Sequence, residues 1–371
     1  MILNILQSIE RFLNDLTVRP GGEKSSPAAG TAVSGRNLRL DNAKGVLIFL
    51  VVLGHFLLPV CVSRPVNNLF YAIYAFHMPC FVMISGHLAA GLMKGGRFRY
   101  ERAAWILLLY LIYELIVWIT EGLAAGQITP WPDFIHESGA PWYLLCLFFW
   151  YLSVPAVSRL RGSGYELFAV LACPAAAIIL KYLFDPGAFL ALDRLISFAP
   201  FFYLGYFWRG ESLDAFLEER GKTFAAAAVI AELFILFAAF DLLMPYSLVV
   251  YGVDFNRYMS VPQHWLWLLN LIWYALAAVI SLGFLALMPD RPLPVVTQLG
   301  RKTLQIYLLH RPVRDLMEFA GFYRHVDPFS LKWLLFLCVF SLLLTLFLSL
   351  TVFGRPLNRL KQLLEKALRA S

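Results

Sequence analysis

Long apolar runs separated by short polar breaks are the dominant pattern of this 371-residue chain. A helix needs about 20 mostly apolar residues to cross the hydrocarbon core of a bilayer. The runs predict ten membrane-spanning helices, at residues 43–62, 69–91, 103–120, 141–157, 167–183, 194–208, 223–243, 265–288, 303–320 and 331–353. The sixth run is short. The ninth holds Arg311, Pro312 and Arg314 in its second half, so a broken, re-entrant or deeply packed helix is expected there. The predicted fold class is an all-α polytopic membrane protein.

Composition supports this fold class and excludes a soluble globular enzyme. Hydrophobic residues make up 60% of the chain and charged residues 15%, with a mean hydropathy of +0.68. An ordinary soluble domain has roughly 45–50% apolar and about 25% charged residues. The five cysteines lie in or beside apolar runs and show no zinc spacing, so we expect small packing residues rather than disulfides or metal ligands.

The basic residues indicate orientation. If the N-terminus is cytoplasmic, most of the 31 Lys and Arg residues fall on the inside of the membrane, and the predicted outside loop 121–140 holds none. The positive-inside rule then predicts that both termini are cytoplasmic. The net charge of +7 therefore reflects topology, and nucleic acid is not an expected partner.

Two flanking segments are expected outside the membrane domain, which covers residues 37–354. Residues 1–36 predict a cytoplasmic amphipathic helix followed by a flexible tether, and residues 355–371 predict a basic amphipathic tail in the cytoplasm. Such a tail could lie on anionic headgroups, so membrane lipid is an expected partner. Small-residue faces on the spans also allow a homodimer.

The first span carries two polar residues at an informative spacing. Lys44 and His55 are eleven positions apart, which on a helix puts them on one face and about 16.5 Å apart along the axis. Lys44, with Asp41, would lie where the helix enters from the cytoplasm, and His55 near the middle of the bilayer. Ionisable groups at that depth are functional candidates. A packing histidine bonded to a neighbouring carbonyl is an equally simple interpretation of His55.

Other spans add polar residues that are unsuited to a lipid face. Glu114 in the third span lies at a depth comparable with His55, so it could fix the imidazole tautomer, or it could bond a neighbouring aromatic residue. Gln305, Tyr307 and His310 in the ninth span should face inward. Ser85 lacks the Gly-x-Ser-x-Gly turn of a hydrolase nucleophile. No residue set matches a metal site, because carboxylates are scarce near the histidines.

Taken in order, several short motifs resemble one family. They are Asp41-x-x-Lys44-Gly45, the Lys44–His55 pair, His-Met-Pro-x-Phe-x-x-x-Ser-Gly at 77–86, Pro-Trp-Tyr-Leu at 141–144, Phe-Phe-Tyr-Leu-Gly-Tyr at 201–206, and Leu-Gly-Arg-Lys-Thr-Leu-Gln-Ile-Tyr-Leu-Leu-His at 299–310. This set is similar to the integral-membrane acyltransferase family 3, and within it to the fucose 4-O-acetylase-related acetyltransferases. The resemblance runs from about residue 36 to 353.

The resemblance implies an O-acetyltransferase of the bacterial cytoplasmic membrane. It would move an acetyl or other short acyl group from cytoplasmic acyl-coenzyme A to a hydroxyl of a cell-surface polysaccharide or its lipid-linked precursor. No cofactor is expected to be permanently bound, since acetyl-coenzyme A serves as the donor substrate. The family's basic residue and essential histidine correspond to Lys44 and His55, with Lys here where many members have Arg. His55 could act as a base or transiently carry the acyl group.

The expected site residues fall into three groups. His55 and Glu114 are the expected catalytic residues, and Lys44, Arg97, Arg99 and Arg102 are expected to bind the donor phosphates. The expected acceptor-binding residues are Asp41, His77, Ser85, Trp142, Gln305, Tyr307 and His310. Two other functions remain open: a transporter or flippase for lipid-linked sugars, whose polar residues would line a path, and an inert scaffold in a glycan-assembly complex.

Overall fold

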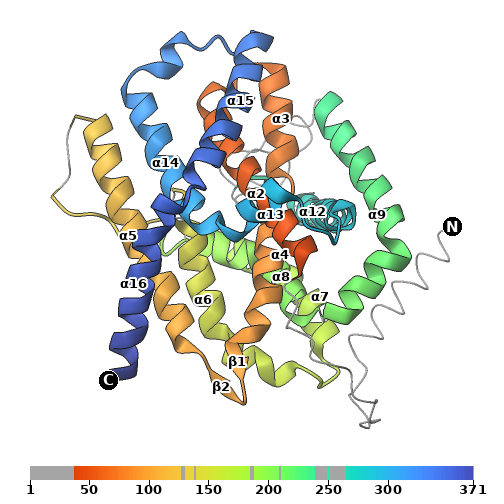
Figure 1. Ribbon diagram of the computed structural model, residues 1–371. Helices are drawn as coiled ribbons and strands as arrows, with labels where there is room; N and C mark the ends of the chain where they lie inside the picture. Colours follow the sequence, from red (N-terminus) through yellow and green to blue (C-terminus); the bar gives the residue numbers. More distant parts are fainter. Residues whose placement is uncertain are drawn as a thin grey trace.

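The computed structural model describes residues 37–126, 130–137, 139–183, 188–208, 210–238, 249–250, 252 and 265–370 (Figure 1). The described helices are α2 (Leu38–Leu57), α3 (Arg64–Tyr74), α4 (His77–Ala89), α5 (Tyr100–Ala124), α6 (Trp142–Val157), α7 (Glu166–Leu183), α8 (Leu192–Phe207), α9 (Gly210–Phe237), α12 (Leu266–Leu287), α13 (Pro294–Arg301), α14 (Thr303–Phe319), α15 (Leu331–Leu348) and α16 (Thr351–Ala370). The amphipathic helix and tether predicted at 1–36 lie outside the described residues.

The bundle confirms an all-α polytopic membrane protein. Within the described residues, seven helical segments are long and apolar enough to cross a membrane: Leu38–Val60, Arg64–Leu92, Tyr100–Ala124, Trp142–Leu160, Glu166–Leu183, Leu266–Leu287 and Leu331–Leu348. The predicted spans at 194–208, 223–243 and 303–320 correspond to α8, α9 and α14, which are helical but shorter or more charged. Residues 239–243 of the second of these spans lie outside the described residues. The count of ten and the orientation of the termini stay predictions.

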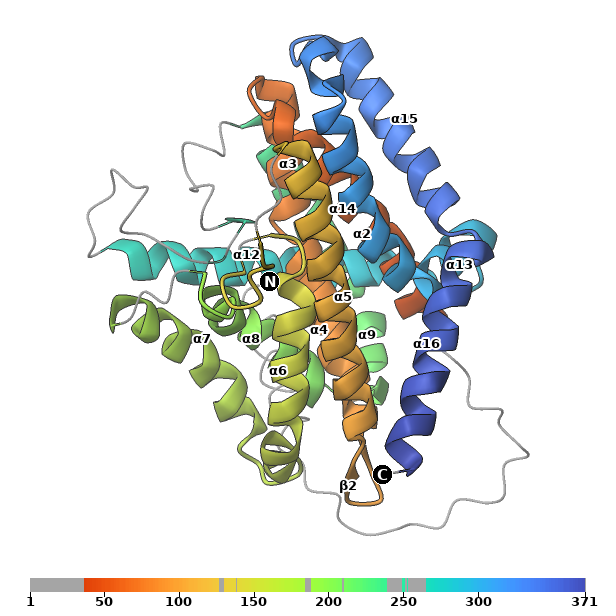
Figure 2. The same ribbon diagram turned by 90° about the vertical axis from the view of Figure 1, so that its left-hand side faces the viewer.

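One small hairpin interrupts the helical pattern. Strands β1 (Met93–Lys94) and β2 (Arg97–Phe98) pair antiparallel between α4 and α5. Gly95 and Gly96 connect them, both with positive φ, which is the backbone that a two-residue hairpin turn requires. Figures 1 and 2 place this hairpin at one end of the molecule and the α14–α15 connection at the other.

The apolar run predicted as one span at 69–91 is divided into α3 and α4, with a break at Ala75 and Phe76. Pro79 lies in the first turn of α4, where its missing N–H removes no helical hydrogen bond. At the break, the carbonyl of Ile73 accepts a hydrogen bond from the His77 ring at 2.7 Å and a longer one from the Phe76 N–H at 3.4 Å. The division therefore presents a histidine side chain in the middle of the bundle.

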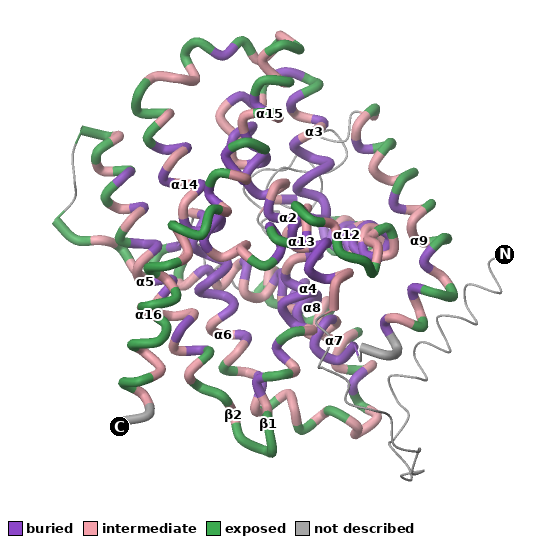
Figure 3. The backbone as a smooth tube through the Cα atoms, viewed as in Figure 1, coloured by how far each residue is buried: buried purple, intermediate pink, exposed green. Residues whose placement is uncertain are grey.

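Glycines in the motifs bring pairs of helices into close contact. A Cβ on Gly86 of α4 would lie 1.9 Å from the carbonyl oxygen of Phe202 in α8, and one on Gly205 would lie 1.9 Å from that of Met83. Gly45 and Gly300 join α2 to α13 in the same way. Figure 3 shows many buried residues in α2, α4 and α8, with more exposed residues on α9, α15 and α16. Figure 2 shows α12 running crosswise to α5 and α6.

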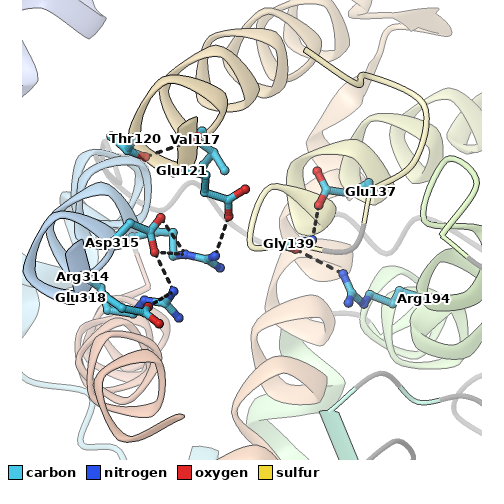
Figure 4. Close-up of polar contacts among 10 residues, drawn as sticks. Val117, Thr120, Glu121, Glu137, Gly139, Arg194, Arg314, Asp315 and Glu318 are labelled. Atoms are coloured by element: carbon cyan, nitrogen blue, oxygen red, sulfur yellow. Dashed lines mark hydrogen bonds and ion pairs between the residues drawn. The ribbon is translucent and has the colours of Figure 1, made fainter. Parts of the chain in front are cut away.

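The charged ninth span forms a continuous helix, α14, preceded by the short helix α13. Its arginines are neutralised locally: Arg311 Nε lies 2.7 Å from Asp315, and Arg314 Nη2 lies 2.7 Å from the same carboxylate. Arg311 also pairs with Glu121 of α5 at 2.8 Å, and Arg314 with Glu318 at 2.9 Å (Figure 4). A broken, re-entrant or deeply packed helix is expected here from the sequence, and the structure has the deeply packed one. These ion pairs offset the cost of burying the arginine charges.

Candidate active site

A partly polar cavity, named here the polar cavity, lies where α2, α3, α4, α6, α8 and α14 converge. Its lining consists of Val51, His55, Leu58, Tyr74, His77, Met78, Gly139, Ala140, Trp142, Arg194, Val250, Tyr307 and Arg311. Two histidines and two arginines thus face the cavity, and none of these lining residues carries a carboxylate. Four of the predicted site residues, His55, His77, Trp142 and Tyr307, are brought together here from positions 55 to 307.

His55 lies in the last turn of α2, with its ring 5.0 Å from the ring of His310 between centroids. Its Nδ1 atom is buried and has no hydrogen-bond partner among the described residues. A Cβ on the adjacent Gly54 would lie 2.7 Å from the ring of Tyr74, so this glycine lets Tyr74 reach the cavity beside His55. The interpretation of His55 as a carbonyl-bonded packing residue therefore has no contact to support it.

His77 and His310 have the carbonyl bond that His55 lacks. The Nδ1 atom of His77 lies 2.7 Å from the carbonyl oxygen of Ile73, and that of His310 lies 3.2 Å from Ile306. A carbonyl oxygen can only accept, so each Nδ1 carries the proton and each neutral ring keeps its lone pair on Nε2. The fold thus fixes the tautomer of both histidines.

The far wall of the cavity combines Arg194, Trp142 and the backbone of Gly139. Arg194, in the first turn of α8, donates from Nη1 to the Gly139 carbonyl at 3.2 Å, and its guanidinium lies 5.4 Å from the centre of the Trp142 ring. Glu137 accepts from the Gly139 N–H at 2.6 Å, and burial raises the pKa of this loop carboxyl (Figure 4). The Tyr307 hydroxyl donates to the Ala140 carbonyl, which fixes the loop above the cavity.

Glu114 does not line this cavity. Its carboxyl lies beside that of Glu137, with Glu121 and Asp133 as further acidic neighbours. The charged and imidazole groups around His55 are instead His310, Arg311, Arg314 and His77. The contact between Glu114 and His55 that depth alone suggested is not formed, because α5 turns this face toward the 130–137 loop.

A second, mostly apolar cavity adjoins the first. Its lining residues are Val51, Met78, Phe81, Ile106, Tyr143, Leu144, Leu147, Thr303, Leu304 and Tyr307, of which Val51, Met78 and Tyr307 also line the polar cavity. Thr303 lies two residues after Arg301, whose Nε lies 3.3 Å from Asp41 at the start of α2. The apolar cavity therefore extends from the His55 region toward the end of α2 that carries Lys44.

Several predicted site residues make structural contacts instead of lining either cavity. Gln305 donates to the carbonyls of Leu348 and Leu350 at 2.6 and 2.9 Å, where α15 ends and α16 begins. Ser85 donates to the Phe81 carbonyl at 2.8 Å and contacts the Tyr143 hydroxyl at 2.6 Å.

At the start of α2, the buried carboxylate of Asp41 lies 2.9 Å from Lys44 Nζ and also pairs with Arg301. Asp41 thereby links α2 to α13 and positions Lys44, which supports the prediction that both residues lie at one end of the helix.

Arg97, Arg99 and Arg102 are exposed residues on β2 and around the start of α5. Figures 1 and 2 both place this hairpin well below the start of α2. The three arginines thus form a separate basic surface and do not gather around Lys44.

Arg194 and Arg311 are lining residues that the sequence reasoning did not assign to the site. Their signal was present, because both are basic residues in apolar surroundings away from the predicted inside loops. Glu137 was missed because its loop carries no helical or strand pattern. Among the described residues, no group of three or more His, Cys, Asp or Glu side chains is placed to hold a metal ion.

Comparison with known proteins gives a consistent result. A family model described as an acyltransferase domain matches residues 37–352. Nodulation protein NolL of Sinorhizobium fredii (strain NBRC 101917 / NGR234) is 33% identical over 202 residues, which are 50% of this chain and 52% of that protein. Nodulation protein NolL of Mesorhizobium japonicum (strain LMG 29417 / CECT 9101 / MAFF 303099) is 27% identical over 208 residues, 53% of each chain.

The chain thus spans about half the length of these curated relatives. No solved structure matches. The family model covers nearly the whole membrane portion, including α2 with Lys44 and His55 and α14 with His310. The chain belongs to the membrane acyltransferase family that this domain defines.

Proposed function

We propose that this protein is an O-acyltransferase of the bacterial cytoplasmic membrane. It transfers an acetyl or other short acyl group from cytoplasmic acyl-coenzyme A to a hydroxyl of a cell-surface polysaccharide or its lipid-linked precursor. The observation that carries the proposal is the junction of the two cavities at Val51, Met78 and Tyr307, where Val51 lies one helical turn before His55 on α2. The polar cavity, with its aromatic and basic lining, is suited to a sugar, and the apolar cavity extends toward Lys44.

His55 supplies the base in this proposal. Nε2 of the neutral imidazole takes the proton of the acceptor hydroxyl as its oxygen attacks the thioester carbonyl. An O–C bond forms, the C–S bond breaks, and the leaving thiolate takes the proton back from His55. Arg311 and Arg194 face the same cavity and can donate hydrogen bonds to the carbonyl oxygen as negative charge develops on it. Attack by His55 itself, giving an acyl-imidazole, uses the same placement.

The donor would reach His55 through the apolar cavity. The phosphates of coenzyme A are at the far end of a long, flexible arm from the thioester, and Lys44 lies about 16.5 Å along α2 from His55. Lys44 is already held by Asp41 at 2.9 Å, so its ammonium group is fixed in place. The exposed arginines on β2 and at the start of α5 would attract the anionic donor from further away.

The acceptor would occupy the polar cavity. Trp142 and Tyr74 present aromatic surfaces there, and such rings pack against the apolar faces of sugars. The lone pair on Nε2 of His77 can accept a hydrogen bond from a second sugar hydroxyl.

The test is transfer of label from [acetyl-14C]coenzyme A in membranes, traced into lipid-linked and polymeric glycan fractions. Wild-type protein should label glycan, and His55→Ala should lose most transfer, on the order of 100-fold or more. His87→Gln is the matched control, because this α4 histidine lines neither cavity and should leave transfer unchanged. Label-free glycan with folded wild-type protein would refute the proposal and favour the transporter.

A further inference from the structure

His55 and His310 each have one buried ring nitrogen without a hydrogen-bond partner among the described residues, and one of these nitrogens can donate the bond that the other can accept. The Nδ1–H of His310 is donated to the Ile306 carbonyl, so its Nε2 bears a lone pair, and that atom is buried without a partner among the described residues. Nδ1 of His55 is likewise buried and without a partner. Unpaired buried polar atoms are rare and cost about 1–3 kcal/mol each, so both need an explanation.

The positions of the two rings supply one. Their centroids are 5.0 Å apart at an interplanar angle of 53°, so the rings are close enough for an N–H···N hydrogen bond once a ring rotation aligns the two nitrogens. His55 lines the polar cavity, whereas the fully buried His310 does not. His310 therefore lies behind His55, on the side away from an acceptor. This arrangement differs from the acceptor-binding role that the sequence suggested for His310.

The other groups around His55 cannot take the same role. Arg311 and Arg314 are its charged neighbours, and a guanidinium can donate a hydrogen bond but not accept one. His77 has a free lone pair, but it faces the cavity where the substrate would sit. Glu114, the expected partner, lies beside Glu137.

We propose that His310 is a positioning residue for His55: Nε2 of His310 accepts the Nδ1–H of His55, which leaves the His55 Nε2 lone pair facing the acceptor hydroxyl. The inference rests on the proposed function. In the transfer step, His55 Nε2 takes the hydroxyl proton while Nδ1–H stays bonded to His310, and the proton on Nε2 then passes to the leaving thiolate. His310 thus fulfils, with a neutral lone pair, the role that a carboxylate has in a Ser-His-Asp triad.

The experiment compares His310→Leu, which removes the acceptor, with His310→Gln, whose amide oxygen can replace it. In the label-transfer assay, His310→Leu should lower kcat on the order of 10- to 100-fold, with the KM for acetyl-coenzyme A changed by less than about twofold. His310→Gln should recover most of the lost rate. In a His55→Ala background, His310→Leu should cause no further loss, because no imidazole remains to be positioned.

A merely structural His310 would give a different pattern. Both variants would then lose activity together, and the loss would persist in the His55→Ala background; either result overturns the proposal. Wild-type label transfer that His310→Leu leaves unchanged also overturns it while the proposed function stands. If wild-type protein transfers no label, the proposed function fails and this inference fails with it.

A measurement on the wild-type protein does not depend on whether the His310 variants fold. Nitrogen NMR of protein carrying ¹⁵N-histidine, with His55 assigned by its loss in His55→Ala, reports the tautomer directly. The expected result is the Nδ1–H tautomer for His55. The Nε2–H tautomer would overturn the proposal.

Discussion

At the scale of single residues, contacts separate the polar side chains that can react from those that hold the fold. Gln305 and Ser85 bind backbone carbonyls of their own bundle, whereas His55 faces a cavity with one ring nitrogen unbonded. Residue type gave no such distinction, because all three are polar residues in apolar runs.

Replacement of Lys44 tests the donor site. Lys44→Gln keeps a polar contact to Asp41 but removes the charge, so it should raise the KM for acetyl-coenzyme A about tenfold with little change in kcat. Arg301→Gln is the matched control, because it also removes a charged partner of Asp41 while leaving Lys44 in place. The measurement is the steady-state KM for acetyl-coenzyme A of the two variants in membranes. An equal rise in KM for both variants would show that the rise comes from disturbing Asp41 and not from losing the Lys44 charge.

Glu137 predicts a pH dependence of stability. Burial raises the pKa of this carboxyl, so the folded state favours its protonated form. The stability of the folded state therefore falls as the pH rises above the ordinary pKa of a glutamate. Glu137→Gln keeps an acceptor for the Gly139 N–H without a charge. Its thermal midpoint in detergent at pH 7 should equal or exceed that of wild type, with the difference shrinking toward pH 5. A wild-type midpoint that rises from pH 5 to pH 7 relative to Glu137→Gln would contradict this.

At the scale of helices, the motif glycines set which elements lie in contact. Gly86 and Gly205 allow α4 and α8 to pack backbone to backbone, and this contact fixes the position of His77 relative to Arg194, because the two residues lie on these helices. Gly45 and Gly300 do the same for α2 and α13. Close approach through small residues is the general mode of packing between helices in a membrane.

Gly86→Ala tests this contact. The added methyl group would lie 1.9 Å from the Phe202 carbonyl oxygen, so α4 and α8 must separate, at a cost of roughly 1–3 kcal/mol. The midpoint of thermal unfolding in detergent should fall. Gly91→Ala provides the comparison, because its nearest atom, on Arg102, would lie 3.8 Å away and its midpoint should be unchanged. Equal midpoints for both variants would show that the α4–α8 contact is dispensable.

At the scale of the whole molecule, the two ends of the helical bundle are distinct, so the orientation of the protein in the membrane can be tested. The hairpin at Met93–Phe98 and the connection between α14 and α15 lie at opposite ends in both views (Figures 1 and 2). The distribution of basic residues predicts that the hairpin end is cytoplasmic.

Cysteine labelling tests the orientation. In intact cells, a membrane-impermeant maleimide should label Phe329→Cys, at an exposed position before α15, and should not label Lys94→Cys on the hairpin until the cells are permeabilised. Wild-type protein measures the background from the native cysteines, of which Cys80 and Cys146 are buried. The reverse pattern would invert the topology and place Lys44 on the outer side.

The sequence by itself determined the class of protein, most helix positions and the pairing of Lys44 with His55 on one face, because these follow from local composition and from the 3.6-residue period. It did not determine which ring lies against His55, the break before His77, or the entry of Arg194 into the site. Those depend on contacts between helices far apart in the chain, and similar depth in a membrane does not specify which faces meet. Tertiary packing placed Glu114 beside Glu137 and His310 behind His55, and so decided the neighbours of the central histidine.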